Sequence, residues 1–220
     1  MAEVRRRPPQ IFVLAGCNGA GKSSIGGEAF RAAGTECFDP DAAARRILQA
    51  NAARGTVVSQ AEANGEAWEQ GVRLLRRAIA ERRDYAFETT LGGDTIARLL
   101  AEAAAAGHEI RVWFVGLASV ELHVDRVRRR VAKGGHDIPV AAIRHRFVRG
   151  RINLIRLLPR LIELRVYDNS VDADPDAGAT PELRPVLHWE EGRIAGPSDL
   201  RQTPEWAKPI VAAARKSGAG

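Results

Sequence analysis

The sequence predicts an α/β fold in which helices cover both faces of a five-stranded, mostly parallel sheet. Short apolar runs alternate with longer segments of helical periodicity, which is the pattern of strand–helix–strand units. The chain has 220 residues, 45% hydrophobic and 27% charged, which is sufficient for one domain with a buried core. The predicted strands are residues 11–15, 36–38, 85–87, 110–115 and 164–167.

Helical patterns fill the intervals between the predicted strands. Trp68, Val72, Leu75 and Ile79 recur at helical spacing before the third strand, and we expect all four side chains in the core. Two further apolar stripes follow the third and fourth strands: Ile96, Leu99, Leu100 and Ala103, and then Val120, Val124, Val127 and Val131.

After residue 170 the sequence changes to a polar, proline-interrupted loop, a hairpin with its turn at Glu191-Gly192, and a short amphipathic helix. We predict a disordered basic tail at 1–10, one domain at 11–170, and a C-terminal extension at 171–220 packed on that domain. No apolar stretch reaches membrane-spanning length, and the basic start lacks the apolar core of a signal peptide. We therefore expect a cytoplasmic protein with no membrane partner.

The stretch GCNGAGKS, residues 16–23, lies between the first predicted strand and a helical pattern, as a G-x-x-x-x-G-K-[ST] phosphate loop requires. Its glycines allow successive N–H groups to point into one anion-binding hollow. Lys22 can reach the β- and γ-phosphates, and the Ser23 hydroxyl can bind Mg²⁺. The sequence therefore predicts a P-loop NTPase. The expected ATP-binding residues are Gly16, Cys17, Asn18, Gly19, Ala20, Gly21, Lys22, Ser23 and Ser24.

Polar residues follow two further predicted strands, where parallel strands present ligands. Asp39-Pro40-Asp41 ends the second strand, and each aspartate can serve as a general base or as a helix N-cap. Glu88, Thr89 and Thr90 follow the third strand and can either bind a sugar or form a turn. These residues leave both interpretations open.

An arginine-rich segment, residues 126–160, carries ten arginines and Lys133 against the single acid Asp137, although the whole chain has a net charge of only +6. We predict a phosphate-binding lid: a helix with Arg126, Arg129 and Arg130, a glycine loop with His136, and a second helix. The alternative is a solvated charged face. Aromatic residues make up 5% of the chain, which disfavours a nucleic-acid partner. The second helix is expected to direct Ile143, Phe147, Leu154 and Leu158 to the core, and Arg146, Arg149, Asn153 and Arg156 to another face.

Taken in order, GCNGAGKS, Asp39-Pro40-Asp41, FETTLGG, RVRRRVAKGGHDIP and VYDNS resemble the zeta toxin family of P-loop kinases, over roughly residues 11–170. The resemblance implies ATP and Mg²⁺ as cofactors and, in the best-understood members, phosphorylation of UDP-N-acetylglucosamine at a sugar hydroxyl, with an antitoxin protein as partner. It also implies that Asp41 is the catalytic base and that Glu88 and Thr90 contact the nucleotide sugar. The lid arginine falls on Arg130, with Arg129 as the alternative and Arg126 one turn earlier.

Three positions depart from the family pattern. Asp94 stands where the family often has a basic residue, and His136 precedes Pro139 where the toxins carry a second lid arginine. Glu69 is the nearest candidate for an acidic substrate contact. The acceptor therefore stays open between a UDP-amino sugar, an antibiotic and a polynucleotide 5′-hydroxyl. A reading from a different class is an ATP-binding switch that docks a partner through the arginine segment.

Overall fold

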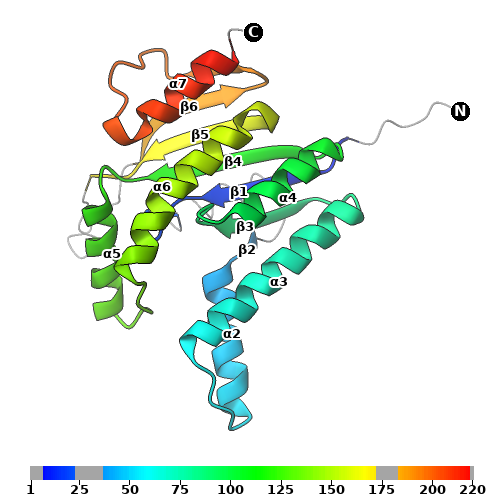
Figure 1. Ribbon diagram of the computed structural model, residues 1–220, viewed down its shortest axis with the longest axis vertical. Coiled ribbons are helices and arrows are strands. Elements are labelled where there is room, and N and C mark those ends of the chain that lie inside the picture. The colour runs from blue at the N-terminus through cyan, green and yellow to red at the C-terminus, as the bar shows by residue number, and fades with distance from the viewer. Residues whose placement is uncertain (1–6, 23–36, 172–182, 219–220) are drawn as a thin grey trace, which may run out of the picture.

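The computed structural model describes residues 7–22, 37–171 and 183–218. These residues form one seven-stranded sheet (Figure 1). In spatial order its strands are β2 (Cys37–Phe38), β3 (Tyr85–Thr89), β1 (Gln10–Ala15), β4 (Glu109–Gly116), β5 (Leu161–Asp168), β6 (Arg184–Glu190) and β7 (Arg193–Gly196). The strands from β2 to β5 pair in parallel, and β6 and β7 are antiparallel additions.

All five predicted strands are confirmed, but the predicted sheet was two strands too narrow. The C-terminal hairpin, with its turn at Glu191-Gly192, pairs directly with β5 instead of lying outside the sheet. Without it, β5 would present an open edge of unpaired N–H and C=O groups. The side chains of Val186, Leu187 and Trp189 are buried, which joins the hairpin to the common core.

The helices are distributed unevenly around the sheet. α4, α6 and α7 lie over one face, whereas the α2–α3 pair extends away from it (Figure 1). The helix expected directly after the phosphate loop falls within residues 23–36, outside the described part of the chain. The described helices are α2 (Pro40–Ala53), α3 (Gln60–Ala80), α4 (Asp94–Ala105), α5 (Val120–Ala132), α6 (Val140–Leu157) and α7 (Lys208–Ser217), with short 3₁₀ turns η1 (Leu158–Arg160) and η3 (Glu205–Ala207).

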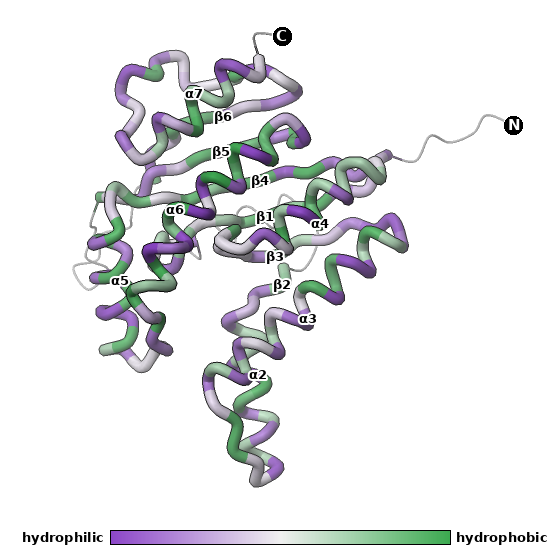
Figure 2. The backbone as a smooth tube through the Cα atoms, viewed as in Figure 1, coloured by the Kyte–Doolittle hydropathy of each residue, from purple (hydrophilic) through white to green (hydrophobic). Residues whose placement is uncertain are grey.

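The main core lies between the sheet and the helices α4, α6 and α7. Side chains alternate along a strand, so Ile110, Val112 and Phe114 of β4 share one face and are buried there. They belong to the same apolar cluster as Leu99 of α4 and Leu154 of α6. Figure 2 shows the matching apolar stretches along the central strands and these helices.

Helix α3 departs from its predicted packing at its N-terminal half. Val72 and Leu75 are buried as expected, but Trp68 is 49% exposed and is not a core residue. At this point α3 has passed beyond the sheet and packs on α2 through small side chains, including Ala63 and Ala67. An alanine interface leaves no room for an indole, so Trp68 is excluded from it and lines a cleft beside the sheet.

The N-terminal end of the described chain is fastened to the loop before β3. The predicted tail covers residues 1–10, of which residues 1–6 lie outside the described part. Arg7 forms an ion pair with Asp84, and the backbone N–H of Gln10 donates to the same carboxylate at 2.8 Å. None of the described helices combines the length and the apolar character needed to cross a membrane.

The buried position of Leu164 in β5 leads to a stability prediction. We expect Leu164→Ala to lower the free energy of unfolding by about 2–5 kcal/mol, because it opens a cavity in a closely packed core. Val57→Ala is the control, because the Val57 side chain is 98% exposed; its expected change is within about 0.5 kcal/mol. Urea unfolding followed by circular dichroism measures both. Equal losses in the two variants would contradict the core assignment.

Candidate active site

The phosphate loop leaves β1 through glycines that no other residue can replace without strain. Gly16, Gly19 and Gly21 have φ of 148°, 78° and 83°. A Cβ on Gly16 would lie 2.3 Å from the carbonyl oxygen of Val115, and one on Gly19 would lie 2.8 Å from that of His123. Positive φ at close intervals directs N–H groups into one concave surface, which is the geometry of an anion-binding nest.

Lys22 ends the described part of the loop. Its Nζ donates to the carbonyl oxygen of Gly16 at 3.2 Å, so the ammonium lies against the loop itself. Two residues predicted to bind ATP or the metal, Ser23 and Ser24, lie outside the described residues.

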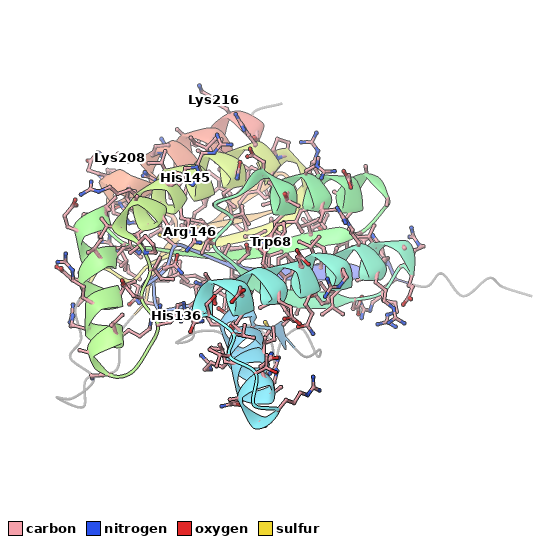
Figure 3. The ribbon with its side chains drawn as sticks, turned by 60° about the horizontal axis from the view of Figure 1, so that its bottom comes forward. Trp68, His136, His145, Arg146, Lys208 and Lys216 are labelled. Carbon is pink, nitrogen blue, oxygen red and sulfur yellow. The ribbon has the colours of Figure 1, made fainter. Side chains whose placement is uncertain are left out.

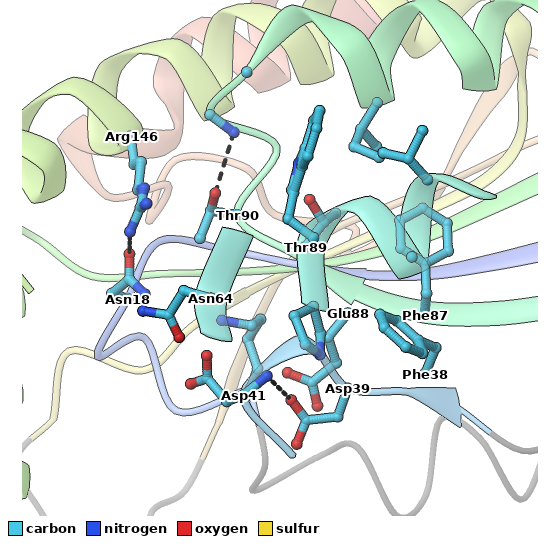
Figure 4. Close-up of a pocket in the computed structure, with 18 of the residues that line it drawn as sticks. Asn18, Phe38, Asp39, Asp41, Asn64, Phe87, Glu88, Thr89, Thr90 and Arg146 are labelled. Atoms are coloured by element: carbon cyan, nitrogen blue, oxygen red, sulfur yellow. Dashed lines mark hydrogen bonds between the residues drawn. The ribbon is translucent and has the colours of Figure 1, made fainter. Parts of the chain in front are cut away.

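Asn18 joins the loop to both lid helices. Its carbonyl oxygen lies 2.8 Å from His123 Nδ1 of α5, and its Oδ1 accepts from Arg146 of α6 at 2.8 Å (Figure 4). A carbonyl oxygen only accepts, so Nδ1 carries the proton. Burial lowers the pKa of His123 to about 4, helped by the nearby cations Lys22 and Arg126. The imidazole is therefore neutral at pH 7 and serves as a hydrogen-bond donor to the loop.

Other contacts fix the loop from the sheet side. The N–H of Gly16 donates to Thr89 O at 3.2 Å, and Asn169 Nδ2 donates to Ala20 O at 2.9 Å. Cys17 is buried beside the carbonyl of Ile143, and burial raises its thiol pKa to about 11. Its side chain is thus a protonated packing group.

Asp39 and Asp41 take different local roles. Asp39 is the N-cap of α2, and its Oδ1 accepts from the N–H of Asp41 at 2.8 Å (Figure 4). Asp41 lies in the first turn, and its side chain is 42% exposed at the cleft. The cap interpretation therefore holds for Asp39, while the Asp41 carboxylate is left facing the cleft.

Glu88, near the end of β3, completes a group of three carboxylates in the cleft. Its pKa is raised, first by burial and then by the charges of Asp39 and Asp41, while Lys22 opposes the shift. Carboxylate oxygens are ligands that Mg²⁺ accepts, and such negative charge favours a cation. The described residues contain no group of three metal-ligating side chains suited to hold an ion alone. The carboxylates of the cleft are thus compatible with a Mg²⁺ that arrives bound to ATP.

The lid meets the cleft at Arg130 and His136. Arg130 Nη1 lies 3.5 Å from Asp41 Oδ2, and its Nη2 donates to His136 O at 3.1 Å. His136 Nε2 lies 4.0 Å from Asp41 Oδ1. Gly135 permits this closure, because a Cβ there would lie 2.8 Å from the Arg130 side chain. Two of the predicted lid residues are therefore brought to the predicted base.

Four predicted lid residues are not among those that line the cleft: Arg130, which reaches Asp41 from its edge, and three others. Arg126 donates to the carbonyls of Asn169 and Val171 at 2.8 and 3.2 Å, and Arg129 lies on the exposed side of α5. Arg149 forms an ion pair with Asp94. Asp94 stands where the family often has a basic residue, and α6 places the basic side chain of Arg149 next to it.

Asn153 was expected on the same face of the second lid helix as Arg146 and Arg149, but its burial on that face was not expected. The residue is buried, and its Nδ2 donates to Leu91 O at 2.9 Å and to Gly93 O at 3.2 Å. Leu91 has a φ of 53°, so the turn after β3 leaves carbonyl groups that need a donor. Asn153 supplies that donor and holds the Glu88–Thr90 segment in place.

The cleft has a volume of about 430 Å³ and extends well past the phosphate loop. Asn64, Trp68 and Phe38 form a wall that the sequence did not predict (Figures 3 and 4). Glu69 of α3, which the sequence suggested as an acidic substrate contact, is instead exposed and paired with Arg73. One sequence signal could have indicated that Trp68 lines the cleft. It is a large aromatic residue in an alanine-rich segment, and the α2–α3 interface formed by that segment admits only small side chains.

A glycine-rich loop with a lysine at the carboxyl end of a parallel strand, neighbouring carboxylates and an arginine-rich lid define a P-loop phosphotransferase. The family model of the zeta toxin matches residues 2–173, so the chain belongs to the zeta toxin family.

The individual proteins and structures that resemble this chain have low sequence identity to it. An uncharacterized protein of Haemophilus influenzae is 26% identical over 133 residues, which cover 60% of this chain and 88% of that protein. The crystal structure of AvrRxo1-ORF1:-ORF2 with ATP has a TM-score of 0.64 at 17% identity and covers 94% of this chain. This chain spans 63% of the length of that protein. The PezAT chromosomal toxin-antitoxin system of Streptococcus pneumoniae has a TM-score of 0.53 at 16% identity, covering 96% of this chain and 86% of that one.

The depressed pKa of His123 predicts an acid-sensitive stability. Above pH 6.5 the imidazole is neutral in both folded and unfolded chains. As the pH falls from 6.5 to about 4, the unfolded chain binds a proton that the folded chain refuses, so the free energy of unfolding decreases. The loss over this window is on the order of 3 kcal/mol.

The variant His123→Gln keeps an N–H donor but does not titrate, and we expect it to lose this part of the pH dependence. His145→Gln, at an exposed position of α6, is the matched control. Urea unfolding between pH 4 and pH 8 measures the three proteins. If His123→Gln and the parent protein show the same slope below pH 6.5, the histidine is not responsible.

Proposed function

We propose that the chain is an ATP-dependent kinase that transfers the γ-phosphate to a hydroxyl of a small molecule, with UDP-N-acetylglucosamine as the first candidate acceptor. The observation that supports the kinase is the cleft-facing carboxylate of Asp41, which shares one cavity with Lys22 of the phosphate loop. A nucleotide switch needs no base beside the γ-phosphate. A kinase needs one to receive the proton of the attacking hydroxyl.

In the proposed reaction the loop N–H groups bind the β- and γ-phosphates, and Lys22 turns from Gly16 O to the phosphate oxygens. Mg²⁺, when bound with ATP, neutralises charge on these phosphates. The acceptor oxygen forms a bond to the γ-phosphorus as the bond to the bridging oxygen of ADP breaks, and the hydroxyl proton passes to Asp41. Arg130, already next to Asp41, is in position to stabilise the charge of the transferring group.

The far side of the cleft is suited to a ring-bearing acceptor. Trp68 and Phe38 offer aromatic surface, while Asn64, Thr90 and Thr95 offer hydrogen-bonding groups. Apolar walls with a few directed polar groups are typical of small-molecule sites. Membership of the zeta toxin family supports UDP-N-acetylglucosamine in particular, and it supports an antitoxin protein as partner.

A direct assay tests the acceptor. We expect purified protein, incubated with Mg²⁺, ATP and UDP-N-acetylglucosamine, to yield the sugar nucleotide with one added phosphoryl group, detected by mass spectrometry. Lys22→Ala is the negative control, because it removes the cation that holds the γ-phosphate. If only another metabolite of a cell extract gains the phosphate, the acceptor is wrong and the kinase stands. If nothing gains phosphate and ATP does not bind, the kinase proposal fails.

Asp41→Asn tests the proposed base. Asparagine keeps the shape of the side chain but cannot accept a proton, so we expect turnover to fall by about 10²–10⁴ while ATP still binds. Steady-state assays together with calorimetric titration of ATP separate the two effects.

Asp39→Asn is the matched control, two residues away. Asparagine is as good an N-cap as aspartate, so this variant should keep both its helix and most of its activity. Full activity in Asp41→Asn combined with loss in Asp39→Asn would exchange the two roles.

A further inference from the structure

We infer that Trp206 in η3, beyond the residues that match the zeta toxin family, is a positioning residue that holds the ATP-binding phosphate loop in its working geometry. The inference rests on the proposed ATP-dependent function. It gives the C-terminal segment a part in nucleotide binding, acting through the Asp168–Asn169 pair at the end of β5.

Trp206 is 4% exposed, and its indole N–H donates to Asp168 Oδ1 at 3.0 Å. Asp168 is itself a buried carboxylate, 7% exposed, at the last position of β5. Among the described residues, its other donors are the Ser170 hydroxyl and Arg184, the latter at 3.4 Å. A buried carboxylate needs every donor it has, so the indole N–H is a main determinant of its orientation.

The indole ring also fits closely over the end of β4. A Cβ on Gly116 would lie 2.3 Å from the ring, so the glycine is what admits Trp206 to this position. The same Gly116 accepts a hydrogen bond from the N–H of Asn169 at 3.0 Å. Trp206 thus sets the ends of both β4 and β5, the two strands between which Asn169 is held.

Asn169 transmits this arrangement to the phosphate loop. It is 2% exposed, its Nδ2 donates to Ala20 O at 2.9 Å, and its own carbonyl accepts from Arg126 at 2.8 Å. Because Asn169 follows Asp168 directly, rotation of Asp168 displaces the amide that holds Ala20. The loop N–H groups on the other side of the same peptides would then lose their common direction.

A second route leads from Trp206 to the other end of the loop. Arg151 of α6 donates to Trp206 O at 3.1 Å and lies 4.1 Å from the centre of the Phe147 ring. Phe147 meets His123 edge to face at 5.5 Å, and His123 holds the carbonyl of Asn18. The C-terminal segment is therefore connected to the loop at two of its carbonyl groups, on Ala20 and on Asn18.

The test is Trp206→Phe, which keeps a buried ring and removes the indole N–H. Trp189→Phe is the matched control: Trp189 is also buried, in β6, and its indole N–H has no hydrogen-bond partner among the described residues. We expect both variants to lower the melting temperature, but only Trp206→Phe to weaken ATP binding, by about tenfold, which lies within the usual range for coupling between distinct sites. Calorimetric titration of ATP with Mg²⁺, well below the melting temperature, measures the affinity. The KM for ATP should rise while the KM for the acceptor stays unchanged.

Two further variants test whether Trp206 acts through Asn169 and keep the inference testable if Trp206→Phe does not fold. Asn169→Ala should weaken ATP binding, and adding it to Trp206→Phe should cost less than the two single losses combined if Trp206 acts through Asn169. Asp168→Asn, which keeps the side-chain volume, should weaken ATP binding in the same direction and replaces Trp206→Phe if that variant does not fold. Parent-like ATP affinity in either folded Trp206→Phe or Asp168→Asn overturns the inference. Absence of ATP binding by the parent protein would instead refute the proposed function.

Discussion

The phosphate loop can aim its N–H groups at an anion only if the carbonyl groups of the same peptides find donors on the opposite side. This constraint explains much of the surrounding structure. Lys22 serves the carbonyl of Gly16, His123 serves that of Asn18, and Asn169 serves that of Ala20. The donors come from the loop itself, from α5 and from the end of β5, so elements far apart in the chain converge on eight residues.

The same constraint explains which features were readable from the sequence. The glycine and lysine spacing of the loop is a local signal, and so is the apolar pattern of the five parallel strands. The glycine turn after β1 and the five strands were therefore predicted correctly. The donors were not predictable, because His123 and Asn169 lie 105 and 149 residues from the carbonyls that they serve. The exposure of Trp68 and the burial of Asn153 were missed for a related reason. Helical periodicity identifies a face, but only the packed fold decides whether that face meets the sheet, another helix or a turn.

The cleft brings strong opposite charges together before any nucleotide is added. Asp39, Asp41 and Glu88 share the cleft, where burial first, and then the two aspartates, raise the pKa of Glu88, and Arg130 comes from the lid to within 3.5 Å of Asp41. Asp41 therefore already faces a cation in the structure without nucleotide. In the proposed reaction, substrate binding would exchange this contact for contacts to phosphate, so part of the electrostatic arrangement precedes binding.

The C-terminal hairpin has a consequence for association with other chains. By pairing with β5 it moves the border of the sheet to β7, a strand of four residues with exposed Arg193, while β2 at the opposite border has only two residues. Short and charged borders are poor templates for strand addition, which is a common route to both aggregation and partner binding. In the described part of the sheet, a protein partner thus has little backbone to extend. Among the described residues, the surface open to a protein partner is therefore made mostly of side chains, on the helices and around the mouth of the cleft.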